Sequence, residues 1–91
     1  MNIINIQRFN TLLDYTHKHS NGRYTLFDNE NKSVEVFYDT DYESDNGLDV
    51  DDERYEEYQC IAFKRVSDGT MIEVSYHQIP IKVICDGETV Y

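Results

Sequence analysis

Positive charge is scarce in this 91-residue sequence, which has eight Lys and Arg against 18 Asp and Glu. A protein that binds nucleic acid directly needs a basic stripe to neutralise phosphates, and this sequence contains none. Long apolar runs are also lacking: no stretch approaches the roughly 20 residues of a membrane span, and the first residues do not read as a signal peptide. We therefore expect neither direct nucleic-acid binding nor membrane insertion.

Cysteine is limited to Cys60 and Cys85, too few for a disulfide framework. We expect a cytoplasmic, reducing setting in which both are small apolar core residues, with a disulfide or a reactive thiol as the alternatives. Glycine-rich phosphate loops and CxxC pairs are absent, and the three histidines are scattered. The sequence predicts no cofactor, no metal site and no enzyme.

Aromatic and apolar residues are well represented, at 40% hydrophobic with eight Tyr and four Phe, so the chain should fold rather than remain a disordered acidic tail. Its length suits one domain spanning residues 1–91. The net charge of −10 is concentrated: the segment 39–57 holds ten of the acids and one base, and so carries −9 of it. The remaining chain is almost neutral.

Periodicity predicts one long helix over about residues 5–20, because Ile6, Phe9, Leu12 and Leu13 recur at helical spacing. The expected strands, which mostly alternate apolar and polar residues, are 23–28, 33–40, 58–66, 71–77 and 81–85.

Polar turns join the first two expected strands into a hairpin and the last three into a meander. Between these groups lies the acidic segment, in which residues 50–58 could form a short helix. The predicted fold class is α+β: one N-terminal helix packed on an antiparallel sheet of about five strands, with an acidic excursion between the second and third.

The acidic segment is also the candidate interaction surface. In an extended chain, alternate residues from Asp39 to Asp45 would project from one face about every 6.6 Å, near two of the roughly 3.4 Å steps of a nucleic-acid strand. Tyrosines interleave with these acids, and tyrosine is enriched in binding hot spots. The predicted partner-binding residues are Asp39, Asp41, Tyr42, Glu43, Asp45, Asp49, Asp51, Asp52, Glu53, Tyr55, Glu56 and Glu57.

Several other interpretations of this segment remain open. An EF-hand-type calcium loop could begin at Asp41, although Gly47 stands one place too late for that motif. Paired carboxylates could serve catalysis, but acids in a solvated segment should all stay ionised. The segment could also be a solubilising loop of a mobile-element interaction module that binds through its sheet. An open sheet edge could form a homodimer.

The acidic stretch Asp-Thr-Asp-Tyr-Glu-Ser-Asp-Asn-Gly-Leu-Asp-Val-Asp-Asp-Glu, residues 39–53, resembles the surface of small phage-encoded inhibitors that mimic nucleic acid. In size, charge layout and composition the chain is similar to anti-CRISPR proteins. The resemblance implies a non-enzymatic inhibitor that acts in the cytoplasm of an infected bacterial host. Its partner would be a basic nucleic-acid-binding protein, such as the Cas nuclease Cas9.

Overall fold

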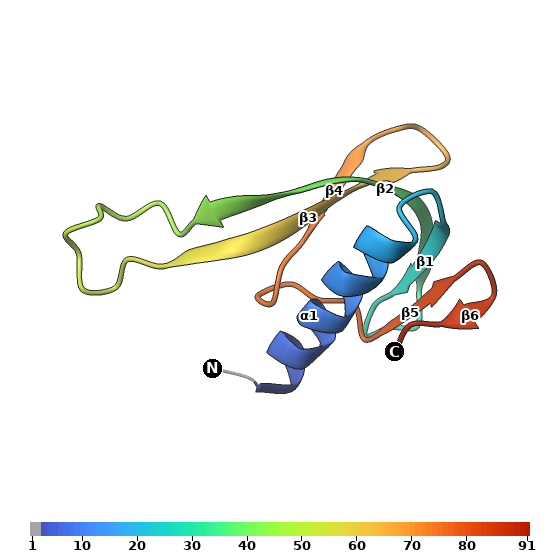
Figure 1. Ribbon diagram of the computed structural model, residues 1–91, viewed down its shortest axis with the longest axis horizontal. Coiled ribbons are helices and arrows are strands. Elements are labelled where there is room, and N and C mark those ends of the chain that lie inside the picture. Colours follow the sequence, from blue (N-terminus) through green and yellow to red (C-terminus); the bar gives the residue numbers. More distant parts are fainter. Residues whose placement is uncertain (1–2) are drawn as a thin grey trace.

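The computed structural model describes residues 3–91, which form one helix and a six-stranded antiparallel sheet (Figure 1). The elements are α1 (Ile3–Lys18), β1 (Arg23–Phe27), β2 (Ser33–Asp45), β3 (Glu57–Arg65), β4 (Met71–Val74), β5 (Lys82–Cys85) and β6 (Glu88–Thr89). The predicted α+β class is confirmed. The sheet has one strand more than the expected five, because the C-terminal tail pairs with β5 as β6. Within residues 3–91, no helix is both long and apolar enough to span a membrane.

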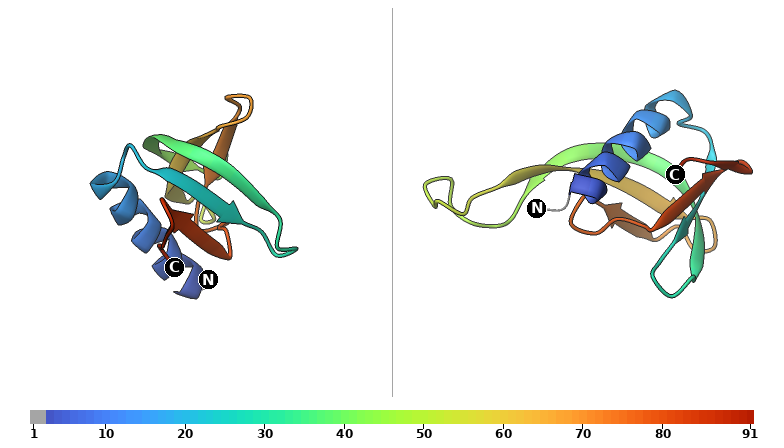
Figure 2. Two further views of the ribbon diagram at one scale, coloured as in Figure 1. Left: turned by 90° about the vertical axis from the view of Figure 1, so that its right-hand side faces the viewer. Right: turned by 90° about the horizontal axis from the view of Figure 1, so that it is seen from below.

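The core lies between α1 and one face of the sheet, as the two further views in Figure 2 show. Phe9 and Leu12 on α1 are buried, as the helical periodicity predicts. They pack with inward-facing residues of β1 to β5, which are Tyr24, Leu26, Val36, Ile61, Phe63, Val74, Val83 and Cys85. The strand alternation therefore correctly identifies the buried face.

The strand order corrects the predicted C-terminal meander. It is β4-β3-β2-β1-β5-β6, so β5 pairs with β1 and not with β4. A turn closed between Ser75 and Gln78 ends β4, and the backbone N–H of Ile81 then donates to the Phe27 carbonyl at 2.9 Å. This bond brings the chain to the free edge of β1. Alternation along β5 reveals which side is buried but not which strand is its neighbour.

The acidic segment also differs from its prediction. β2 continues to Asp45 and β3 begins at Glu57, so residues 39–57 form a hairpin together with the facing residues 58–62 of β3. This hairpin is here called the acidic arm. Residues 50–58 could have been a loop or a short helix, and the helix does not form: residues 50–54 form turns. Such a helix would have placed like charges one turn apart, which is unfavourable. β1 pairs with β2 only as far as Phe37, so the arm projects from the body as a two-stranded ribbon (Figure 1).

The close approach of Gly22 to β5 fixes the connection after α1. A Cβ atom at this position would lie 2.5 Å from the Cys85 Sγ atom, so only glycine permits the contact. Cys85 and Cys60 are both buried and unpaired, which agrees with their prediction as core residues.

Candidate functional site

A β-bulge in β2 sets the orientation of the acidic arm. The pairing of β2 with β3 shifts between Tyr38 and Thr40, which leaves Asp39 as the extra residue. In a regular strand, residues three apart point to opposite faces. Because of the bulge, Tyr38 lies opposite Phe63 and Asp41 lies opposite Ile61, so both face the side covered by α1.

A cluster of four side chains forms where the arm leaves the body, and we call it the base cluster: His17, Tyr38, Asp41 and Gln59. The Tyr38 hydroxyl donates to Asp41 Oδ2, and His17 Nε2 on α1 lies 2.7 Å from the same oxygen. Gln59 Nε2 donates to Asp41 Oδ1 at 3.4 Å. A single carboxylate therefore joins the helix to both strands of the arm.

The electrostatics of the base cluster keep Asp41 ionised. Partial burial on its own raises the pKa of the Asp41 carboxyl, but hydrogen bonds from Tyr38 and His17 outweigh this effect and lower the pKa. Burial and the bond to Asp41 together raise the pKa of Tyr38 to about 12. At neutral pH, the Tyr38 hydroxyl therefore keeps its proton and donates a hydrogen bond to the ionised carboxylate of Asp41.

The prediction that alternate residues from Asp39 to Asp45 project from one face is wrong for Asp39. The bulge turns Asp39 to the opposite face, where its Oδ1 atom lies 3.7 Å from Lys64 Nζ. Asp41, Glu43 and Asp45 do share the face that carries Ile61.

Farther along the same face, two glutamates meet across the ribbon. A hydrogen bond between the side chains of Glu43 and Glu57, together with their mutual repulsion, raises the pKa of Glu43. The Tyr55 hydroxyl donates to Glu57 Oε1 at 2.7 Å, and this bond lowers the pKa of Glu57. The middle of the arm therefore holds two carboxyl groups in hydrogen-bonding contact.

The outer face of the arm carries aromatic side chains. Tyr42 is half-buried, and a hydrogen bond to Glu73 on β4 raises its pKa to about 12. The Tyr58 ring meets the His77 ring edge-on, with centroids 4.8 Å apart. His77 Nε2 also lies 3.3 Å from the buried Oε1 atom of Glu56, so both histidine contacts of the arm connect it to the body.

The tip of the arm, residues 46–56, holds the most exposed acids. The Asn46 side chain donates to the Arg54 carbonyl at 2.6 Å and closes the loop. Asp52 pairs with Arg54 at 3.2 Å, and this contact lowers the pKa of Asp52. Among residues 3–91, no side-chain hydrogen bond or ion pair engages Asp49, Asp51 or Glu53, all of which are exposed.

The structure thus places the twelve predicted partner-binding residues on one arm, but with different roles. Asp41 and Glu56 hold the arm to the body, while Tyr42 and Tyr55 are half-buried rather than free anchors. Asp41, Glu43 and Asp45 lie along a regular strand, so the EF-hand-type calcium loop does not form. Among residues 3–91, no group of three or more His, Cys, Asp and Glu is arranged to hold a metal ion.

The sequence analysis missed His17, Gln59 and His77 as contacts of the arm. No local pattern marks them, because each is brought to the arm by packing between distant elements. The bulge, which is needed to align Tyr38 with Asp41, also has no glycine to indicate it.

One comparison with known proteins gives a match. The family model described as cognate immunity protein YxxD matches residues 7–68, which is more than half of the chain. The chain belongs to the YxxD family of cognate immunity proteins. The matched part of this YxxD protein includes most of α1, strands β1 to β3 and the whole acidic arm. No curated protein and no solved structure matches the chain.

Membership in the YxxD family makes the chain a small inhibitor that works through protein–protein interaction. This agrees with the expectation of an inhibitor that binds a partner protein. Neither the anti-CRISPR resemblance nor Cas9 as the target gains support from these comparisons.

Proposed function

We propose that this YxxD protein neutralises a cognate toxin by inserting its acidic arm into a basic cleft where the toxin would hold nucleic acid. The observation that carries the proposal is the two-stranded ribbon, with a charge of −9, that projects from an almost neutral body. We place the interaction in the cytoplasm, as the scarcity of cysteine suggests.

The charges of the arm are available to a partner. Seven of its ten acids have exposed side chains, and Arg54 is the only base between residues 39 and 57. A concentrated charge of this kind steers an oppositely charged partner and accelerates association. The almost neutral body offers these charges no comparable attraction, so the exposed part of the arm stays extended.

The base cluster supports the proposal because it holds the arm in place before binding. Contacts from both α1 and β3 to Asp41 restrict the arm, and a restricted surface loses less entropy on association. The bulge between Tyr38 and Asp41 places both side chains on one face, so the bond that restricts the arm depends on this irregularity.

The test compares two triple variants that change the net charge equally, from −10 to −7. The arm variant carries Asp49→Asn, Asp51→Asn and Glu53→Gln, which remove three exposed acids of the tip. The body variant carries Asp14→Asn, Glu30→Gln and Glu88→Gln, which remove three exposed acids elsewhere.

Each form is immobilised and used to capture its partner from bacterial lysate, at low and at high salt. The captured protein is then assayed for binding to a fluorescent oligonucleotide. We expect the wild type and the body variant to compete with the oligonucleotide, and the arm variant to bind at least about tenfold more weakly, since each rim charge contributes up to about 1 kcal/mol. High salt should weaken the wild-type complex steeply.

Two results would refute the proposal. One is equal affinity of the arm and body variants, and the other is a partner that binds oligonucleotide and this protein at the same time. If the captured protein is a Cas nuclease, the mimicry of nucleic acid is supported, but the target is that nuclease and not a toxin.

A further inference from the structure

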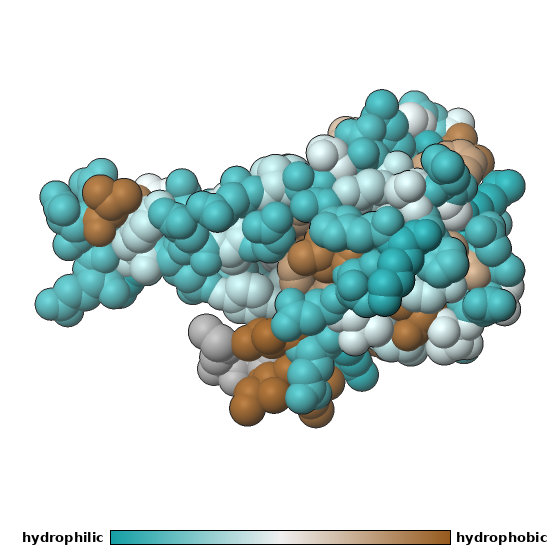
Figure 3. All heavy atoms as spheres, in the orientation of Figure 1, coloured by the Kyte–Doolittle hydropathy of each residue, from teal (hydrophilic) through white to brown (hydrophobic). Residues whose placement is uncertain are grey.

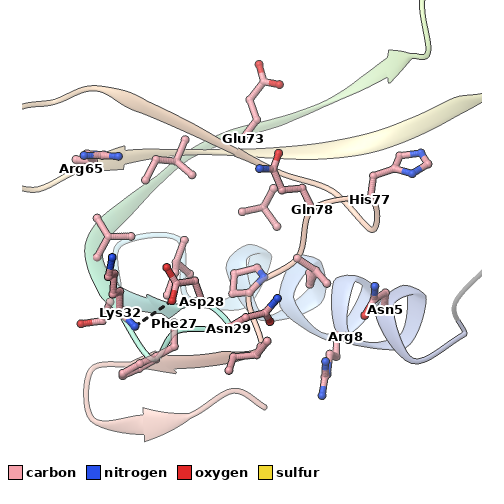
Figure 4. A pocket seen from close by; sticks show the side chains of 18 residues that line it. Asn5, Arg8, Phe27, Asp28, Asn29, Lys32, Arg65, Glu73, His77 and Gln78 are labelled. Atoms are coloured by element: carbon pink, nitrogen blue, oxygen red, sulfur yellow. Dashed lines mark hydrogen bonds between the residues drawn. The ribbon is translucent and has the colours of Figure 1, made fainter.

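A groove on the side of the body has no role in the proposed function. It has a volume of about 680 Å³ and opens between α1, the turn after β1, β4 and the connection to β5 (Figure 4). Its apolar lining includes Leu26, Val34, Ile72, Val74, Ile79 and Ile81. This volume falls within the usual range of sites that bind a ligand or a few side chains.

The rim of the groove is basic, which is unusual on a protein of net charge −10. Arg8 lies on one side of the groove, and Lys32 and Arg65 lie at the opposite end (Figure 4). Neither guanidinium forms an ion pair with a carboxylate of residues 3–91, whereas Lys32 pairs with an exposed glutamate of its own turn.

The two acids that line the groove do not cancel this charge. The Asp28 Oδ1 atom accepts hydrogen bonds from the backbone N–H groups of Glu30 and Lys32 and so is used within its own turn. Glu73 bonds to Tyr42 on the outer face of the sheet and points away from the cavity (Figure 4). The groove therefore combines an apolar floor with a rim of three basic side chains, of which Lys32 is paired with Glu30 and Arg65 lies near Asp68.

A segment with the complementary chemistry exists on the same chain. Val50, 73% exposed, lies on the tip of the acidic arm between Asp49 and Asp51. Figure 3 shows an apolar spot at the far end of a largely hydrophilic arm, where the apolar residues of the tip are Leu48 and Val50. An apolar side chain flanked by carboxylates matches an apolar floor flanked by guanidinium groups in both polarity and charge.

We propose that a second copy of this chain docks the tip of its acidic arm in this groove. The tip and the groove lie on different parts of the molecule. Two copies can therefore each dock the tip of the arm in the groove of the other, whereas docking in one direction only would add further copies in a row. A docked tip is hidden from other partners. If the proposed function holds, the toxin can bind the arm only after the self-associated copies dissociate. The contact between the tip and the groove does not itself depend on a toxin.

The test uses variants that reverse charge on each half of the contact. The groove variant carries Arg8→Glu and Arg65→Glu, and the tip variant carries Asp49→Lys and Asp51→Lys. Sedimentation velocity is measured at low salt from about 1 μM to about 1 mM, where contacts of modest affinity are populated. We expect the wild type to associate and each variant alone to remain monomeric. An equal mixture of the two variants should associate again, because the basic tip then meets an acidic rim and the unchanged tip of the groove variant meets the unchanged groove of the tip variant.

A second pair of variants isolates the apolar part of the contact without changing charge. Val50→Ser should weaken self-association about tenfold, whereas Met71→Ser, an exposed apolar residue outside the groove, should leave it unchanged. In a further measurement, unlabelled wild type is added to ¹⁵N-labelled Val50→Ser protein. The amide shifts should fall in residues 72–81 and 26–34, which line the groove.

The proposal is overturned if wild type stays monomeric over the whole range. It is also overturned if self-association survives both Val50→Ser and the groove variant, or if the shifts lie along the sheet edges instead. Circular dichroism of each variant separates a lost contact from a lost fold.

Discussion

Replacing Tyr38 with Phe tests whether the base cluster holds the arm to the body. The substitution keeps the aromatic ring against the core and removes only the hydroxyl that donates to Asp41 Oδ2. The carboxylate loses one of its donors and retains His17 and Gln59. No cavity is created, so the change in the free energy of unfolding reports the hydrogen bond.

The magnitude follows from the charge and exposure of the pair. Hydrogen bonds to charged groups contribute roughly 1.5–3 kcal/mol when buried, and the lower end applies here because the Asp41 side chain is 18% exposed. We expect Tyr38→Phe to lower the free energy of unfolding by about 1.5 kcal/mol at neutral pH. For a domain of this size the melting temperature should fall by roughly 6–12 °C.

The assay is urea unfolding of wild type, Tyr38→Phe, Asp41→Asn and the double variant, at neutral and acidic pH. The folded pKa of Asp41 is below its ordinary value, so its stabilisation is present above that ordinary value of 3.8 and is lost as the pH falls through the folded pKa. The coupling between Tyr38 and Asp41 should be about 1 kcal/mol at pH 7 and should shrink below about pH 4.

A matched control is Tyr55→Phe, which removes an equivalent hydroxyl–carboxylate bond to Glu57 on the exposed part of the arm. Solvent competes for that bond, so the loss should be clearly smaller than that of Tyr38→Phe. Equal losses for Tyr38→Phe and Tyr55→Phe, or coupling of Tyr38 and Asp41 that does not change with pH, would refute the reasoning.

Two further predictions concern the body and the arm separately. Gly22→Ala should destabilise the fold by roughly 1–3 kcal/mol in thermal unfolding, because the new Cβ atom would overlap the Cys85 Sγ atom. Adding Cys85→Ala should recover part of this lost stability. Unchanged stability of Gly22→Ala would contradict the close approach. Replacing residues 47–55 with an Asn-Gly turn, which keeps Glu56 and its contact with His77, should leave the melting temperature within a few degrees of wild type, because the removed residues are not part of the core. A melting temperature lower by about 10 °C or more would contradict this.

The sequence predicts the parts of the fold that local patterns determine. The helix and all five expected strands are present, because the apolar residues alternate with the period of each element and are buried as expected. The position of β5 beside β1 could not be predicted in this way, since it depends on contacts between residues about 60 positions apart, such as Tyr24 and Cys85.

The sequence marked the acidic segment as a candidate interaction surface but did not predict its conformation. Ten acids gave little reason to expect a paired ribbon, and a helix or loop was the natural prediction for residues 50–58. The strands extend because Cys60, Ile61 and Phe63 anchor β3 in the body and β2 follows it outward. The bulge at Asp39 depends on the register of that pairing, which no single residue specifies.

The separation between arm and body has a consequence for how such proteins can diverge. Residues 40–45 of β2 pair with residues 57–62 of β3, so adding or removing two residues on each strand would change the reach of the ribbon and keep every side chain on its face. The core residues on α1 and β1 would keep their positions. Under the proposed function, the exposed tip of the arm can change in sequence without changing the core or the base cluster, so a lineage of these proteins could follow a changing toxin through substitutions in the tip.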